Sequence, residues 1–230
     1  MPPRPLTEIA EACVRVFISK GFRDAGISDV AKALNLSHGA VYTYADSKQT
    51  LLYLALVRLL DPLALESMEL PVKVPPPETV LETVEGWARR QHGFDRLSEV
   101  LQSPVSETAH EDLGVIVEEI YDFIAQNRIV LSMFERCAED LPELAQWYFV
   151  ERRRGMLAAL AEFLEARISA GLLRPVPDVP TAARFIVESI AWFALHRHGD
   201  PDSAMLTDED SRSTVRALVP AAFLPMGDPR

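Results

Sequence analysis

The chain has 230 residues, 48% of them hydrophobic, and a mean hydropathy of +0.04, so it can bury a substantial core. Its net charge of −11 argues, taken alone, against a nucleic-acid-binding protein. The charge is uneven, however, because residues 1–54 carry six Lys or Arg and five Asp or Glu, a balance of +1 that leaves −12 for the remainder. No apolar run approaches the ~20 residues that span a bilayer, which argues against a membrane protein.

The N-terminal residues and the cysteines indicate the compartment. The stretch MPPRPLTEIA lacks the apolar segment of a secretory signal. The two cysteines, Cys13 and Cys137, both fall in apolar helical segments. We interpret them as buried thiols of a reducing compartment, not as a disulfide, and therefore predict a cytoplasmic protein.

The first predicted helix covers residues 7–20. Thr7 is placed to cap its start, and Gly21 is placed to end it in a left-handed conformation. Its apolar residues form one stripe, which we expect to pack on the following helices: Ile9, Cys13, Val16 and Phe17.

Residues 26–45 have the pattern of a helix-turn-helix. Asn35 tolerates the left-handed conformation that a helix requires just past its end, and Ser37 is placed to cap a second helix over residues 38–44. The first helix has apolar residues at the i, i+3, i+4, i+7 spacing of one buried face: Ile27, Val30, Ala31 and Leu34.

The second helix of this motif has an almost bare N-terminal turn. Gly39 and Ala40 would let the backbone approach a large flat partner, while Val41 points to the core. His38, Tyr42, Thr43 and Tyr44 offer polar groups around this turn, and Lys48 opens the next helix behind a Ser47 cap. This arrangement suits a recognition helix in the major groove of DNA, with phosphates held by hydroxyl groups and a helix N-terminus.

The run from Ile9 to Leu52 resembles the DNA-binding domain of the tetracycline-repressor (TetR) family. The matching segments are CVRVFISKGF at 13–22, DVAKALNLSHGAVYTY at 29–44 and SKQTLL at 47–52. The sequence departs from the family pattern where a hydroxyl pair is replaced by Ala25-Gly26, a lysine by His38, a phenylalanine by Ala45 and the glycine of the turn by Asn35.

The rest of the chain reads as helix. A helix from residue 48 is strongly apolar and is expected to kink at Pro62, and the proline-rich segment 70–78 is a linker. We therefore predict an all-α protein, in which a three-helix helix-turn-helix domain (residues 3–63) is joined by a long helix to a helical ligand-binding and dimerisation domain (residues 78–224). The helices expected in the second domain cover residues 78–102, 112–138, 142–170, 180–198 and 209–224.

The resemblance implies two further features of the second domain. The two long helices before the C-terminal tail are apolar on more than one face, which is compatible with the four-helix dimer interface of the family. The family also implies a pocket for a small ligand. Its candidate lining residues, each of which has plain core packing as the alternative, are Trp87, Phe94, Tyr121, Phe134, Trp147 and Trp192.

Other chemistry has little support in the sequence. The segment His196–Asp202 contains histidines and aspartates that suit a metal, but histidines at i and i+2 point to different sides of a helix, so a helix end with a turn is the simpler interpretation. The Arg152–Arg154 run is most simply a solvated face or a set of ion pairs. We find no catalytic constellation, no metal site and no cofactor motif.

The sequence therefore predicts a DNA-binding transcriptional regulator, a repressor released by an unknown small-molecule effector, that binds a palindromic double-stranded operator as a homodimer. The alternatives are an all-helical enzyme or apolar-ligand carrier with a vestigial DNA-binding head, and a ligand-independent architectural DNA binder. The predicted DNA contacts divide into base-edge residues Ser37, Gly39, Ala40 and Thr43, and phosphate residues His38, Tyr42, Tyr44 and Lys48.

Overall fold

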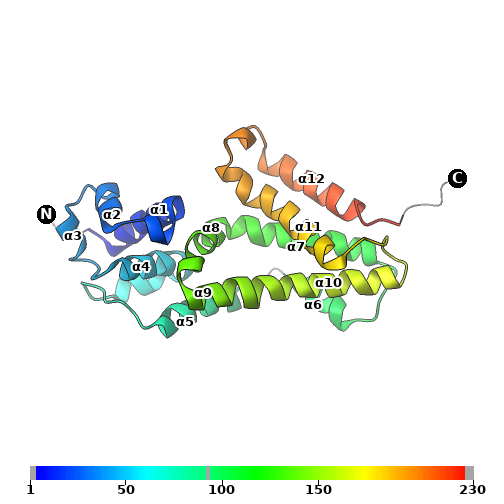
Figure 1. Ribbon diagram of the computed structural model, residues 1–230, viewed down its shortest axis with the longest axis horizontal. Helices are drawn as coiled ribbons and strands as arrows, with labels where there is room; N and C mark the ends of the chain where they lie inside the picture. The colour runs from blue at the N-terminus through cyan, green and yellow to red at the C-terminus, as the bar shows by residue number, and fades with distance from the viewer. Residues whose placement is uncertain (1–3, 92–93, 226–230) are drawn as a thin grey trace. The chain divides into compact units, whose positions relative to one another are not determined.

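The structure, a computed structural model, describes residues 4–91 and 94–225 (Figure 1). Within these ranges the regular structure is helical, apart from one isolated bridge between Ala45 and Val72, so the predicted all-α class is confirmed. Pro3, with which the predicted first domain begins, lies outside the described residues. The chain divides into two compact units, of which the first holds residues up to Gln91 together with Ile129–Tyr148 and the second holds the remainder.

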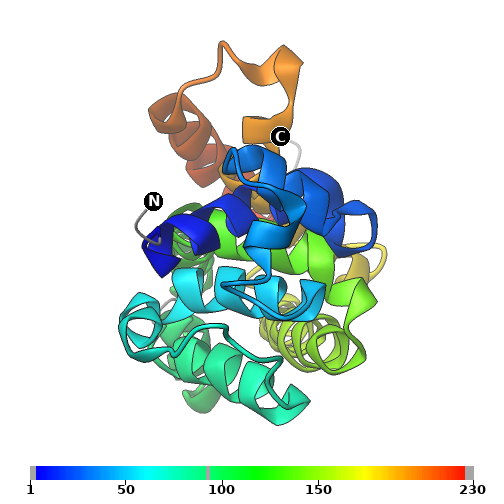
Figure 2. The same ribbon diagram turned by 90° about the vertical axis from the view of Figure 1, so that its left-hand side faces the viewer.

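The first unit contains the helix-turn-helix. In Figures 1 and 2, α4 lies between α1 and α5, and its buried residues accordingly surround the helix instead of forming one stripe. The elements of this unit are α1 (Leu6–Asp24), α2 (Ile27–Ala33), α3 (His38–Val41), α4 (Lys48–Leu60), the 3₁₀ turn η1 (Pro62–Ser67), α5 (Pro77–Arg89), α8 (Arg128–Cys137), the 3₁₀ turn η2 (Ala138–Asp140) and α9 (Pro142–Ala145).

The second unit is built around α11, which packs against α7, α10 and α12. Its fully buried residues include Ile116, Leu160, Phe163 and Ile186. The elements of this unit are α6 (Asp95–Gln102), α7 (Ala109–Gln126), α10 (Arg154–Ser169), α11 (Val179–Ala194), the 3₁₀ turns η4 (His196–Gly199) and η5 (Pro201–Ser203), and α12 (Asp208–Ala221). The π-helical segment η3 (Gln146–Arg153) precedes α10 and contains the point at which the units divide.

The start of α1 differs from the prediction. The helix begins at Leu6 and Thr7 lies exposed inside its first turn, because the carbonyl of Pro5 already accepts the N–H of Glu8 at 3.0 Å. Gly21 does adopt a left-handed φ of +78°, but the chain resumes helical structure up to Asp24 instead of ending there.

Several predicted long helices are interrupted. The predicted helix 112–138 breaks at Asn127, whose side chain and N–H both donate to the carbonyl of Phe123, at 2.9 and 3.1 Å. The predicted helix 78–102 is divided into α5 and α6. Pro62 does not kink α4 but follows its end, since the residue before a proline is disfavoured in the α conformation and Asp61 has φ −152° and ψ 70°.

None of the helices in the described ranges combines the length and the apolar character that a membrane crossing requires. The helix from residue 48, predicted to be strongly apolar, spans only Lys48–Leu60.

Candidate DNA-contacting surface

The first motif helix, α2, is fixed at both ends by local hydrogen bonds. At its start, the Asp29 carboxylate accepts the N–H of Gly26 at 2.8 Å and pairs with Lys20 at 2.5 Å. The hydrogen bond from Lys20, and then the one from Gly26, lowers the pKa of Asp29, so this carboxylate stays charged at the helix N-terminus. Glycine at the cap position is therefore compensated by an acidic side chain three residues on.

The turn between α2 and α3 follows the predicted chemistry. Asn35 has φ +52°, and the N–H of Leu36 donates to the carbonyl of Ala31 at 2.9 Å, which is the closing bond of a Schellman motif. Val30, Ala31 and Leu34 are buried as expected, whereas Ile27 is only half-buried. The turn thus directs the chain out of α2 and into α3 without a glycine.

The second motif helix, α3, is short and is fixed by an N-cap and one buried side chain. The Ser37 hydroxyl accepts the N–H of Ala40 at 3.2 Å, as predicted for an N-cap, and Val41 is buried. The regular α-helix ends at Val41, after which the Thr43 hydroxyl donates to the carbonyl of Ala40 at 2.7 Å. This hydroxyl group therefore keeps only its acceptor capacity for a partner.

The outward side of α3 is bare at its first turn. Ser37, His38, Gly39 and Thr43 are exposed, and a Cβ placed on Gly39 would meet no atom within 4 Å. The His38 and Tyr42 rings meet edge to face with centroids 5.4 Å apart, and Tyr42 is 43% exposed. The first turn of α3 therefore exposes its backbone beside the rings of His38 and Tyr42.

Tyr44 differs from the other predicted contact residues. It is only 6% exposed, and its hydroxyl accepts the backbone N–H of Arg4 at 2.8 Å. Its role in the described structure is to fix the N-terminal arm ahead of α1. Burial and this bond argue against a phosphate contact for Tyr44.

Lys48 lies at the start of α4, whose first turn is capped by the Ser47 hydroxyl accepting the N–H of Thr50 at 3.1 Å. The Lys48 ammonium donates to the carbonyl of Arg23 at 3.0 Å and lies 4.5 Å from the centroid of the Phe22 ring. One of its three N–H groups is thus used to hold the end of α1, which leaves two for another partner.

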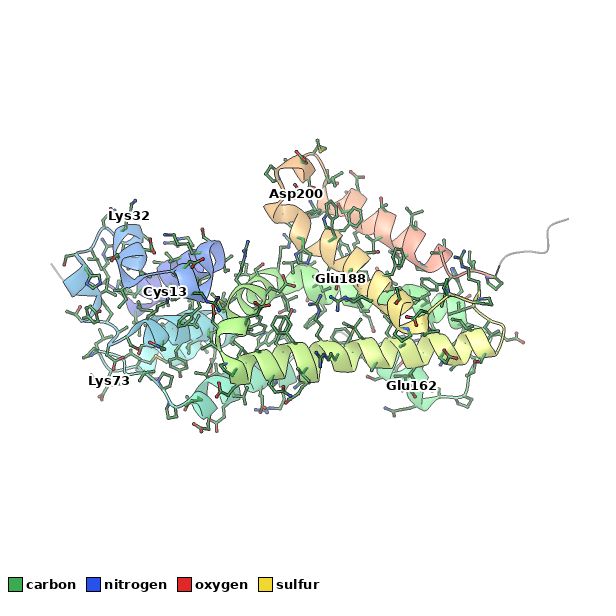
Figure 3. All side chains as sticks on the ribbon, in the orientation of Figure 1. Cys13, Lys32, Lys73, Glu162, Glu188 and Asp200 are labelled. Atoms are coloured by element: carbon green, nitrogen blue, oxygen red, sulfur yellow. The ribbon has the colours of Figure 1, made fainter. Side chains whose placement is uncertain are left out.

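Some exposed lysines of this unit were not selected as DNA contacts from the sequence. Lys32 on α2 and Lys73 in the linker are both exposed, and both are labelled in Figure 3. The Lys73 ammonium is 3.9 Å from the Asp46 carboxylate, which precedes the Ser47 cap. The bridge between Ala45 and Val72 helps to bring the linker to this surface, and that pairing has no signal in the sequence.

Two family models match the chain. Residues 9–53 match "Bacterial regulatory proteins, tetR family", and residues 113–221 match "AefR-like transcriptional repressor, C-terminal domain". The chain belongs to the TetR family. It is therefore a DNA-binding transcriptional regulator, and the members of this family are regulators, not enzymes. Among the curated proteins, none matches the chain.

Several solved structures of transcriptional regulators are similar to this chain. The ketosteroid transcriptional regulator KstR2 of Mycobacterium tuberculosis is 19% identical with a TM-score of 0.55, over 97% of each chain. The probable transcriptional regulatory protein RHA5900 is 18% identical with a TM-score of 0.54, over 97% of this chain and all of the other. FadR from Bacillus subtilis, solved with stearoyl-CoA, is 18% identical with a TM-score of 0.45, over 92% of this chain and 96% of that one.

The six aromatic residues predicted to line a TetR-type pocket are divided between the two units. Phe134 packs between Trp87 and Trp147, with ring centroids 5.8 Å away on each side, and all three are buried in the first unit. The other three lie in the second unit, where Phe94 packs on Phe123 at 5.1 Å, Tyr121 is buried, and Trp192 packs on Phe193 at 4.8 Å. Burial and mutual ring packing of Trp87, Phe134 and Trp147 agree with core packing, the alternative that the sequence left open.

The His196–Asp202 segment forms a structural tie. Arg197 is buried, donates to the carbonyls of Phe193 and Leu206 at 2.8 Å each, and pairs with Asp208 at the start of α12. Within the described ranges no three His, Cys, Asp or Glu side chains lie close enough together to hold a metal ion. In the Arg152–Arg154 run, Arg153 pairs at 2.6 Å with Glu188 of α11. Glu188 is labelled in Figure 3.

Proposed function

We propose that this TetR-family regulator is a repressor that binds a palindromic operator as a homodimer and releases it when a small-molecule effector binds. In this proposal residues 3–63 form the DNA-binding domain and residues 78–224 the ligand-binding and dimerisation domain. The match of residues 113–221 to a repressor C-terminal domain supports the choice of repressor over activator.

The bare first turn of α3 carries the DNA-binding part of the proposal. Ser37, Gly39, Ala40 and Thr43 approach base edges, because the N-terminal residues of a recognition helix enter the major groove and no side chain at Gly39 keeps the backbone away. The phosphate contacts are assigned to the exposed polar groups at the sides of this turn and to the next helix N-terminus: His38, Tyr42 and Lys48. Tyr44 is omitted because it is buried.

A homodimer would place two such turns on one face of the duplex. The two heads of a dimer meet successive major-groove faces about 34–36 Å apart or a multiple of that distance. The face of α11 that supports dimerisation exposes Phe185, which is 53% accessible, and Trp192, which is 37% accessible. These residues are seven positions apart and therefore lie on the same side of the helix. Large apolar side chains exposed in this way indicate a surface that another molecule covers.

The effector must supply a bounded amount of energy. To lower the population of the DNA-binding state from 99% to 1%, the effector must bind the other state more tightly by about 5.5 kcal/mol. A mostly apolar site with one or two polar groups is sufficient for that difference, since burial contributes about 25 cal/mol per Å² of apolar surface.

The DNA-binding assignment is tested by a substitution that adds bulk without touching the protein. Gly39→Leu should keep the melting temperature of the wild type, because a Cβ added there meets no protein atom within 4 Å. It should weaken binding to the DNA that precedes the protein's own coding region at least about tenfold, because a loss of about 1.4 kcal/mol of contact energy lowers the affinity tenfold. Affinity is measured by fluorescence anisotropy, together with a footprint.

Gly199→Leu is the matched control, because Gly199 is also exposed with no atom within 4 Å of an added Cβ. Its DNA affinity should equal that of the wild type. Unchanged binding by Gly39→Leu, in a protein that footprints the same DNA, would remove α3 from the proposed interface.

A further inference from the structure

The first unit contains a cavity next to the helix-turn-helix. Its volume is about 160 Å³, and it lies between the first half of α4, the segment that leads into α5, and the start of α9. None of the six aromatic residues predicted for the ligand pocket lines it. Its walls are mostly apolar, with Leu52 and Leu56 of α4, Val80 and Leu81 of α5, and Leu144 of α9.

The size and lining of the cavity define the class of molecule that fits. Dry apolar cavities of about 150 Å³ lined by aliphatic and aromatic side chains bind benzene-sized molecules. Leu52, Leu56 and Leu144 are buried, so a ring placed against them contacts aliphatic side chains. A compact apolar molecule with a single ring or a small fused ring therefore matches the space.

The polar residues of the cavity define the head group. Gln49 and Glu143 line the cavity from exposed positions, and the carboxylate of Glu143 is a pure acceptor when ionised. Tyr53 also lines the cavity, and its hydroxyl group is hydrogen-bonded to Thr83. A ligand that carries an N–H or O–H donor at one end can hydrogen-bond there, whereas a ligand that carries a carboxylate meets a like charge.

Each wall of the cavity is tied within a few residues to the DNA-binding helices. The α4 wall begins one residue after Lys48, which donates to the carbonyl of Arg23 at the end of α1. The α5 wall follows Val72, whose N–H donates to the carbonyl of Tyr44 at 2.8 Å and whose carbonyl accepts the N–H of Asp46 at 3.2 Å. These two bonds bracket the short segment that joins α3 to α4.

The third wall has a comparable tie. Leu141 follows Asp140, whose carboxylate accepts the backbone N–H of Arg23 at 3.1 Å and pairs with its guanidinium at 2.8 Å. A molecule inserted between the walls therefore acts on α1, on the segment after α3 and on the first turn of α4 through short hydrogen-bonded links.

From this geometry we propose that the cavity between α4, α5 and α9 binds a small apolar ring compound bearing an N–H or O–H donor, and that its occupation weakens DNA binding by displacing the ties to α1 and α3. The regulatory half of this inference rests on the proposed function, because it requires that the protein bind DNA. The binding half does not, because it concerns the free protein.

The binding half is tested with indole as the probe, titrated into the full chain without DNA and followed by saturation-transfer NMR. Leu81→Trp fills the cavity from the half-buried face of α5, and Val115→Trp places the same side chain on an exposed position of α7 outside the cavity. We expect the wild type and Val115→Trp to bind indole equally and Leu81→Trp to lose at least tenfold in affinity.

Benzoate is the second probe, and it should bind the wild type at least tenfold more weakly than indole because of Glu143. Equal binding of indole to Leu81→Trp and the wild type would overturn the site, as would equal affinity for benzoate and indole. If Leu81→Trp does not fold, Val80→Phe fills the same space with a smaller side chain, and the same comparison applies.

The regulatory half is tested by measuring DNA affinity at saturating indole. We expect it to fall at least about fivefold, the lower end of typical coupling between two sites, in the wild type and not in Leu81→Trp. Unchanged DNA affinity in a wild type that binds both indole and DNA would overturn the regulatory inference. Failure to bind any DNA without indole would instead contradict the proposed function, and the NMR comparison would still decide the site.

Discussion

At the residue scale, hydrogen bonds between near neighbours in the chain fix the turn between α2 and α3 and the cap of α3. Asn35 and Ser37 act through bonds to residues within five positions, so their identities were sufficient to predict a left-handed turn and an N-cap. Tyr44 could not be predicted in the same way, because its burial depends on the Arg4 backbone forty residues away. Lys73 was missed for the same reason, since the pairing of its neighbour Val72 with Ala45, after the recognition helix, is a tertiary contact.

Gly21 offers a direct test of backbone strain. It has φ +78°, and a Cβ there would lie 3.2 Å from the carbonyl oxygen of Arg136. We predict that Gly21→Ala lowers the free energy of unfolding by about 1–2 kcal/mol, the cost of a left-handed conformation for a residue with a side chain, with more if Arg136 cannot shift. Urea unfolding of the full chain measures this change.

The matched substitution is Gly114→Ala in α7, where an added Cβ meets nothing within 4 Å. It should leave the stability unchanged or raise it by up to about 1 kcal/mol, since alanine is the better helix former. Equal losses for the two variants would show that the left-handed conformation of Gly21 is not what makes glycine necessary.

The two cysteines give a second test at this scale. Both are free and buried, as the sequence predicted, and burial raises the pKa of Cys13 to about 12 and of Cys137 to about 11. Because the thiolate is the reactive form, both thiols should be protonated at pH 8 and react with a disulfide reagent at least about a hundredfold more slowly in the native protein than in urea. Rapid modification of either thiol in the native state, at the rate of a small free thiol, would contradict their burial.

At the scale of elements, the existence of the helices was predictable and their interruptions were not. The apolar spacing continues across Asn127, because α7 and α8 each have a buried face. The helix nevertheless ends there, because the Asn127 side chain donates to the carbonyl of Phe123. The π-helical segment Gln146–Arg153 lies inside the predicted helix 142–170 and leaves its overall extent intact. Hydrophobic spacing therefore reports where a helix is buried, whereas hydrogen-bond competition decides where it is interrupted.

The exposed face of α11 belongs to this scale. Phe185→Glu combined with Trp192→Glu should convert a dimer of the full chain to a monomer at micromolar concentration, because two charges would replace the large apolar side chains proposed to meet the partner subunit. Sedimentation velocity measures the change in mass. Leu218→Glu, at a 64% exposed position of α12, is the control and should remain dimeric.

A wild-type chain that sediments as a monomer at the same concentration would refute the proposed interface. A double variant that stays dimeric would move the interface away from this face of α11.

At the scale of the whole molecule, the class and the family were predictable from the sequence, whereas the compact units depend on tertiary contacts. The proline-rich segment 70–78 suggested a boundary there, yet α5 packs in the same compact unit as α4, and the Arg90 guanidinium donates to the carbonyl of Leu60 at 2.8 Å. The return of residues 129–148 to that unit has no signal in a linear sequence. The cavity proposed as a ligand site is built from this return, which explains why aromatic composition did not predict its lining residues.

The net charge of −11 also requires interpretation at this scale. A chain of this charge is repelled by DNA unless positive groups and hydrogen-bond donors are concentrated where the two meet. Lys32, Lys48 and Lys73 lie in the first unit, which also carries α3. The negative net charge of the whole chain, taken alone, argues against DNA binding. The lysines of the first unit show why it does not exclude it.

The most direct measurement of the central claim is selection of duplexes from a random pool by the purified full chain, in parallel with Gly39→Leu and Gly199→Leu. We predict that the wild type and Gly199→Leu enrich one inverted repeat with half-sites about one helical turn apart or a multiple of that distance, and that Gly39→Leu enriches none. Enrichment of the same repeat by all three proteins, or of no sequence by the wild type at low salt, would contradict the account.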